Sequence, residues 1–211
     1  MDQLSQSMRT IALFLFLACL QHCLGQTDTN VLATGDWSEI VLDNRSNCLR
    51  GRLLVYNDER QEATRQARVY LELQHLPSTR GSSLPLDVYF GIFDETNTLH
   101  FEMRDEHDRP IPRDLISIDG IMPAPYHVII PCDSTIRLRA DLYSIGLGSY
   151  RDGLGILAGG FWFIPPNATN EYFLSATFTA KDHPVPFENH DFWQGTLHLP
   201  KVKIPVPAKK P

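Results

Sequence analysis

The chain has 211 residues, of which 43% are apolar, and a formal net charge of −6 at neutral pH. This length is typical of one domain, and the apolar share is enough for a packed core. A mildly acidic chain lacks the concentrated basic surface that binds phosphate backbones. We therefore expect a single globular domain and no nucleic acid among its partners.

Residues 1–25 have the layout of a secretory signal peptide. A polar start with one positive charge, Arg9, precedes the apolar stretch 11–20, and we expect cleavage after Gly25. In a rival interpretation, Cys23 is the lipid-anchored first residue of the mature chain. The later sequence contains no run of the roughly 20 apolar residues that a transmembrane helix needs. The sequence thus predicts a secreted or periplasmic protein without a transmembrane segment.

Alternation of apolar and polar residues dominates the rest of the chain. This period-two pattern predicts strands with one buried face. It occurs at residues 49–55, 69–73, 86–92, 99–103, 136–142 and 172–178. Turn-forming residues such as Asn57, Pro77 and Gly120 separate the stretches. One helix-like stretch, 59–67, is polar almost all round, and we interpret it as an exposed connection.

The C-terminal segment 193–206 predicts a strand with an irregularity. Its apolar positions are odd at Leu197 and Leu199 but even from Val202 onward, so a regular strand would turn the second half to the other face. A bulge at 200–201 would keep both halves on one face. Its prolines cannot donate hydrogen bonds to a neighbouring strand, which favours a position at a sheet edge.

These strands predict an all-β fold, a single two-sheet antiparallel β-sandwich with immunoglobulin-like topology first and a jelly roll second. We assign residues 26–46 to an N-terminal linker or arm, 47–206 to the sandwich domain and 207–211 to a flexible tail. The C-terminal half contains W-Q-G-T-L at 193–197 and P-x-V-x-I-P at 200–205. By these motifs the chain resembles small exported bacterial β-sandwich proteins. The resemblance implies the fold and carries no activity.

Removal of the signal peptide leaves two cysteines, Cys48 and Cys132. In an exported protein such a pair predicts a disulfide, and a bridge that closes so long a loop contributes at most about 4–5 kcal/mol. Structural thiols and a chemical role for Cys132 are the alternatives. A catalytic thiol needs a base, and the nearby His127 is an odd number of residues away, on the opposite face of an alternating strand.

Three segments contain residue types that bind ligands elsewhere. The glycine-rich segment 145–167 lacks the following helix of a phosphate-binding loop. Two clusters combine histidines with carboxylates, namely Asp105, Glu106, His107 and Asp108, and His183, Glu188, His190 and Asp191. The first is either a cation loop or a solvated hairpin turn, and the second lacks the histidine spacing of a zinc hydrolase. We predict no metal ion, no cofactor and no catalytic residue, since Ser134 also lacks a local base.

Several arginines fall on outward positions of the predicted strands: Arg50, Arg52, Arg104, Arg137 and Arg139. They form either an anion-binding face or cross-strand ion pairs. We favour ion pairs, for which the carboxylates are Glu72, Glu102, Asp87 and Asp141. Sequons at Asn44 and Asn167 are glycan acceptors only in a eukaryotic secretory pathway.

The sequence favours a secreted, non-enzymatic protein with a binding or structural role and with a protein or a glycan as its partner. One alternative is an extracellular glycan-binding module, and another is an enzyme or enzyme inhibitor that acts through long loops. Aromatic residues are the candidates for ligand contact. Phe161, Trp162 and Trp193 fit a core, since 161–164 is apolar on both faces, whereas Tyr150 lies in a loop and is our candidate for ligand binding.

Overall fold

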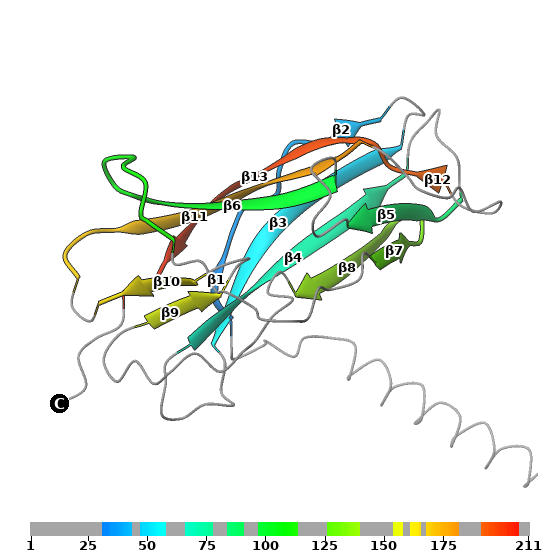
Figure 1. Ribbon diagram of the computed structural model, residues 1–211. Helices are drawn as coiled ribbons and strands as arrows, with labels where there is room; N and C mark the ends of the chain where they lie inside the picture. Colours follow the sequence, from blue (N-terminus) through cyan, green and yellow to red (C-terminus); the bar gives the residue numbers. More distant parts are fainter. Residues whose placement is uncertain are drawn as a thin grey trace, which may run out of the picture.

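All regular secondary structure in the described part of the chain is β in the computed structural model (Figure 1). The structure describes residues 31–43, 47–57, 66–77, 84–90, 97–113, 126–139, 154–157, 161–165, 168–181 and 191–206. These residues form several sheets, most of whose strand pairs are antiparallel. The predicted all-β class is therefore confirmed.

The largest sheet, sheet A, has seven strands in the order β1-β3-β4-β9-β10, with β2 beside β3 and β8 beside β4. Its strands are β1 (Val31–Thr34), β2 (Val41–Leu42), β3 (Cys48–Asn57), β4 (Gln66–Leu76), β8 (Ser134–Arg139), β9 (Leu154–Leu157) and β10 (Phe161–Ile164). The pairing of β4 with β9 is parallel, which the sequence did not predict. Within residues 26–46, which the sequence assigned to a linker or arm, β1 and β2 pair with the edge of β3.

Two three-stranded sheets complete the fold. Sheet B has the order β12-β5-β7, with β12 (Asp191–Phe192), β5 (Leu86–Phe90) and β7 (Tyr126–Ile130). Sheet C has the order β13-β11-β6, with β13 (Gly195–Ile204), β11 (Tyr172–Ala180) and β6 (Asn97–Asp105). Figure 1 shows the three strands of sheet C as one layer over β3 and β4.

One hydrophobic core joins the three sheets. At Gly51 of β3, an added Cβ would lie 2.9 Å from a methyl carbon of Leu199 and 3.0 Å from one of Leu197, so β3 and β13 approach closely there. Phe178 of sheet C stacks on Phe90 of sheet B with ring centroids 4.6 Å apart, and on Trp193 at 5.7 Å. Alternating side chains of each strand thus fill one shared interior.

The predicted bulge in the last strand is confirmed. In the pairing of β13 with β11, Leu199 is opposite Ala176 and Val202 is opposite Leu174, so residues 200 and 201 together face Ser175. The extra residue keeps Leu199 and Val202 on the same buried face. The order of sheet C places β13 at its end, as the prolines predicted.

The expectation that residues 161–164 form a core strand with two apolar faces is confirmed in part. They form β10, in which Trp162 and Ile164 are buried and the indole Nε1 of Trp162 donates to the carbonyl oxygen of Ile111 at 3.2 Å. Phe163, however, is 36% exposed. The strand is therefore not buried on both sides, because β10 is the end strand of a sheet that packs on the core with one face. Trp193 is a core residue, as expected.

Candidate functional site

Arginine side chains gather on the outer surface of sheet A, opposite the core. In the antiparallel register, Glu72 of β4 lies between Arg52 of β3 and Arg137 of β8. Residues two positions along each strand share this side, because strand side chains alternate. The resulting surface, which we call the arginine face, consists of Arg50, Arg52, Arg68, Glu72, Gln74, Thr135, Arg137 and Arg139.

Among its described strand positions, the arginine face has five arginines and one glutamate. Glu72, which is 6% exposed, takes two of them: its Oε2 lies 2.5 Å from Nε of Arg52 and its Oε1 lies 3.2 Å from Nη2 of Arg137. Arg50 donates from Nε to Oε1 of Gln74 at 2.8 Å. The expected pairing of arginines with Glu72 is therefore confirmed.

Aromatic rings support these guanidinium groups. The Cζ atoms of Arg50 and Arg52 lie 4.8 Å and 4.4 Å from the centroid of the Trp37 ring. Arg137 lies 5.2 Å from the Tyr56 ring on its own side of the sheet. Such cation–π contacts are attractive and restrict the long arginine side chains. The donors are therefore held in place before any ligand arrives.

Exposure divides the arginine face into two parts. The side chain of Arg52 is 28% exposed and that of Arg137 is 42% exposed, and Arg139 beside it on β8 is also exposed. Of the apolar and aromatic residues on the same side of these strands, Leu54 and Tyr56 are buried, and Tyr70, opposite Arg139, is half-buried. The exposed side chains of this face on β8 are thus Thr135, Arg137 and Arg139.

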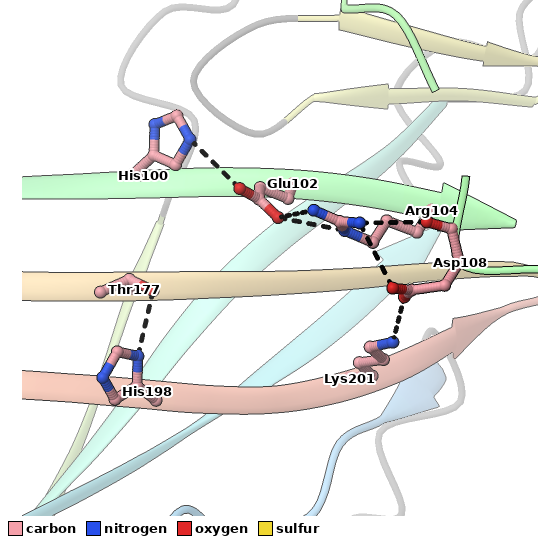
Figure 2. A network of polar contacts seen from close by, with 7 residues as sticks. All are labelled: His100, Glu102, Arg104, Asp108, Thr177, His198 and Lys201. Atoms are coloured by element: carbon pink, nitrogen blue, oxygen red, sulfur yellow. Dashed lines mark hydrogen bonds and ion pairs between the residues drawn. The ribbon is translucent and has the colours of Figure 1, made fainter. Parts of the chain in front are cut away.

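The outer face of sheet C carries both signs of charge in a connected network (Figure 2). Oε2 of Glu102 accepts from Arg104 at 3.1 Å and 3.2 Å, which confirms the pair expected for this arginine. Arg104 also contacts Asp108 at 3.4 Å, and Asp108 accepts from Nζ of Lys201 at 2.7 Å. Exposed pairs of this kind contribute about 0–1 kcal/mol each to stability. This face is balanced in charge.

The cluster at residues 105–108 is a hairpin turn. Asp105, which is 5% exposed, accepts hydrogen bonds from the backbone N–H groups of His107 and Arg109, both at 2.9 Å, and from Nε of Arg109 at 2.7 Å. Burial raises the pKa of Asp105, but these hydrogen bonds from Arg109 and His107 outweigh it and the pKa is lowered. A hydrogen bond from Lys201 lowers the pKa of Asp108. The carboxylates of Asp105 and Asp108 thus stabilise the turn. This agrees with the interpretation of the cluster as a hairpin turn.

Asp87, which we expected to pair with an arginine, has a histidine as a partner. Asp87, which is 1% exposed, contacts Nδ1 of His127 with both carboxylate oxygens, at 3.1 Å and 3.2 Å. His127 belongs to the partner strand β7 and its ring lies 5.0 Å from that of Tyr89. Sequence alone did not reveal this pair, because nothing in the chain specifies that β5 and β7 are neighbours.

Neither Cys48 nor Cys132 takes part in a disulfide among the residues that the structure describes. Cys48 pairs with Leu76 of β4 from one side, while Cys132 lies in the turn before β8, which pairs with β4 from the other side. Neighbouring strands are about 4.8 Å apart, so residues on either side of a central strand are about 10 Å apart. A disulfide needs Cα atoms within about 7 Å. The strand order therefore explains why the predicted bridge is not formed.

Several predicted residues lie outside the described part of the chain. They are Cys23, Asn44, Asp141, Tyr150, Asn167, His183, Glu188 and His190, together with the signal peptide, most of the glycine-rich segment, and the tail. Their roles stay predictions. Of the second histidine and carboxylate cluster, the structure describes only Asp191, in β12.

The sequence analysis did not include Arg68 in the arginine face and did not indicate that Trp37 contacts its guanidinium groups. Arg68 occupies an outward position of β4, so strand alternation alone was sufficient to find it. Trp37 lies after β1, in the segment interpreted as a linker, and no local pattern predicted its contact with β3. The same holds for His100 and His198, which the strand order of sheet C places in one row.

No family model, curated protein or solved structure matches this chain. In its described residues, no helix is long and apolar enough to cross a membrane.

Proposed function

We propose that the protein is an exported, non-enzymatic β-sandwich of immunoglobulin-like topology that binds anionic polysaccharides through the arginine face. One observation carries the proposal: the strand positions that the structure describes on the arginine face include five arginines and one glutamate, on a chain that is acidic as a whole. Export rests on the signal-peptide pattern of residues 1–25. The packing of sheet C over β3 supports the sandwich.

A polyanion fits this surface better than a protein partner does. Anchors at protein interfaces are mostly Trp, Tyr and Arg side chains that fill well-packed pockets, and on this face Tyr56 is buried and Tyr70 is half-buried. Guanidinium groups donate paired hydrogen bonds to carboxylate and sulfate oxygens. Arg137 and Arg139 lie two positions apart on β8, about 6.7 Å along the strand. Two donors at such a spacing suit a chain with regularly repeated charges.

The test compares the protein with two double variants of equal charge change. In Arg137→Gln/Arg139→Gln the exposed part of the arginine face loses two cations, and in Lys201→Gln/Lys203→Gln the outer face of sheet C loses two. Heparin, polygalacturonate and neutral dextran are the probes, and calorimetry gives the Kd at two salt concentrations. We expect a polyanion to bind, more weakly at higher salt, and the arginine double variant to raise the Kd roughly tenfold or more, since two exposed contacts contribute about 0.7 kcal/mol each.

The lysine double variant should bind like the unchanged protein. An equal rise of the Kd in both double variants would mean that binding depends only on the net charge of the protein. That result would overturn the assignment to the arginine face. Binding of dextran as tight as that of the charged polymers would also overturn it, as would a lack of binding to both polyanions. Single-stranded DNA serves as a further probe, and a lower Kd for DNA than for heparin would replace the polysaccharide by a nucleic acid.

A further inference from the structure

Two exposed apolar side chains border the arginine face at β2. Leu42 pairs with Cys48, and Val41 pairs with Leu49. Because Val41 packs against the core and strand side chains alternate, Leu42 and Ile40 point outward, on the side of the arginine face. Ile40 is 52% exposed and Leu42 is 62% exposed, the two largest values among the large apolar side chains that the structure describes. Hydrocarbon is thus open to solvent beside the arginines.

The apolar surface continues across the sheet. Cys48 pairs with Leu76 of β4, so Leu42, Cys48 and Leu76 form one row on the outer side. Leu76 is half-buried. We call Ile40, Leu42 and Leu76 the apolar strip. The next outward residue along β3 is Arg50, so the apolar strip and the arginine face adjoin as parts of one surface.

Charge distinguishes the two parts of this surface. Asp36 and Glu39, both exposed, lie in the segment that leads into β2. Their carboxylates disfavour an anionic group over the apolar strip. The exposed Arg137 and Arg139 lie on β8, which β3 and β4 separate from β2, so the two strands are about 14 Å apart. A ligand therefore fits best when its charged groups lie toward β8 and an uncharged, apolar group lies over β2.

Contact with the apolar strip adds affinity that charge alone does not supply. Transfer of apolar side chains from water to hydrocarbon is favourable, and the gain depends on the area removed from water. Ile40 and Leu42 are more than half exposed, so a hydrocarbon chain laid over them removes much of their remaining area from water. The hydroxyl groups of an unmodified sugar chain do not replace this contact, because they stay hydrated.

We propose that the arginine face and the apolar strip together bind an anionic glycolipid. Its charged sugar chain lies along the arginines, and its hydrocarbon chain lies on Ile40, Leu42 and Leu76. The inference rests on the proposed function, because it names the class of anionic polysaccharide that the same surface takes. A lipid bilayer fits less well, since its anionic headgroups would also lie over Asp36 and Glu39. A second copy docked face to face would bring two sets of arginines together.

The experiment uses a heparin octasaccharide with and without an octyl chain at its reducing end. The two probes carry the same charges and differ only in hydrocarbon, and calorimetry gives the Kd of each. We expect the octyl probe to bind the unchanged protein roughly tenfold more tightly than the plain probe. In Ile40→Ser/Leu42→Ser the two probes should bind alike, and the Kd of the plain probe should equal that of the unchanged protein.

Leu84→Ser/Ile129→Ser is the matched control. Leu84, which precedes β5, is 41% exposed and Ile129 of β7 is 45% exposed, so the same residue types are shortened outside the apolar strip. This variant should keep the preference for the octyl probe. Both double variants should melt at the temperature of the unchanged protein, because all four side chains are exposed.

The outcomes separate this inference from the proposed function. Equal Kd values of the two probes for the unchanged protein would overturn the glycolipid and leave polysaccharide binding intact. A lack of binding of both probes would overturn both proposals. Loss of the octyl preference in Leu84→Ser/Ile129→Ser would show that exposed hydrocarbon anywhere on the protein is sufficient, and would overturn the apolar strip. A lower Tm of Ile40→Ser/Leu42→Ser, with weaker binding of the plain probe, would assign these residues to structure.

Two further measurements identify other occupants of the apolar strip. If phosphatidylglycerol vesicles bind the unchanged protein but not Ile40→Ser/Leu42→Ser, and the octyl probe has no advantage, a bilayer surface replaces the glycolipid. Sedimentation gives the oligomeric state without ligand. A dimer that becomes a monomer in Ile40→Ser/Leu42→Ser would assign the strip to contact with a second copy of the chain.

Discussion

Gly51 is where the packing of sheet C on sheet A can be tested most directly. An added Cβ at this position would lie 2.9 Å from Leu199, 3.0 Å from Leu197 and 3.0 Å from Leu73, in each case from a methyl carbon. These distances are shorter than ordinary carbon–carbon contacts of about 3.5–4.0 Å. A larger residue therefore forces the leucines, or the two sheets, to move.

The size of the effect depends on opposing contributions. Overpacking a core costs about 1–3 kcal/mol, while loss of glycine from the unfolded chain returns about 0.4–1 kcal/mol. For Gly51→Ala the two contributions are similar, and we expect little change in the free energy of unfolding. For Gly51→Val the overpacking is larger, and a net loss of about 2 kcal/mol lowers the Tm by roughly 4–8 °C in a chain of this size.

Thermal unfolding followed by circular dichroism provides the assay, and Thr135→Val provides the control. Thr135 is exposed on β8, so the same new residue should change stability there by less than about 0.5 kcal/mol. A second check adds Leu199→Ala to Gly51→Val, since the shortened side chain makes room for valine and the double variant should lose less than the sum of the single losses. If Gly51→Val melts at the temperature of the unchanged protein, β3 and β13 do not pack against each other at this point.

Three further predictions concern the cysteines, the last strand and the hairpin turn. Because β4 separates Cys48 from Cys132, protein produced without residues 1–25 should, when denatured without reductant, take up two alkyl groups, as measured by mass spectrometry. A peptide pair linked through these residues would contradict the strand order. Removal of the chain from Trp193 onward deletes β13 and should abolish cooperative unfolding. Removal of residues 207–211 should change the Tm little. If the two truncated proteins melt at the same temperature, the assignment of the last strand is refuted. The lowered pKa of Asp105 adds stability that is complete above its ordinary value of 3.8 and is lost as the pH falls through the folded value. The Tm difference between the unchanged protein and Asp105→Asn should therefore shrink from about pH 5 to about pH 2, and a constant difference would argue against it.

The sequence predicted those features that depend on neighbouring residues. Strand alternation located β3, β4, β5, β6, β8 and β11, because side chains two apart share a face and the buried face must be apolar. The change of parity between Leu199 and Val202 predicted the bulge, because only an extra residue keeps both on the core side. These inferences need no knowledge of which strands pair.

Features that depend on distant residues were missed for one physical reason. Strand order is set by packing between segments far apart in the chain, so a single sequence did not specify that β4 lies between Cys48 and β8, or that β6 and β13 flank β11. The disulfide prediction relied on a count of cysteines and took no account of distance. The arginine face was predicted in part. Strand alternation identified the outward arginines correctly, but the contact of two arginines with one carboxylate, Glu72, follows only from the register of three strands.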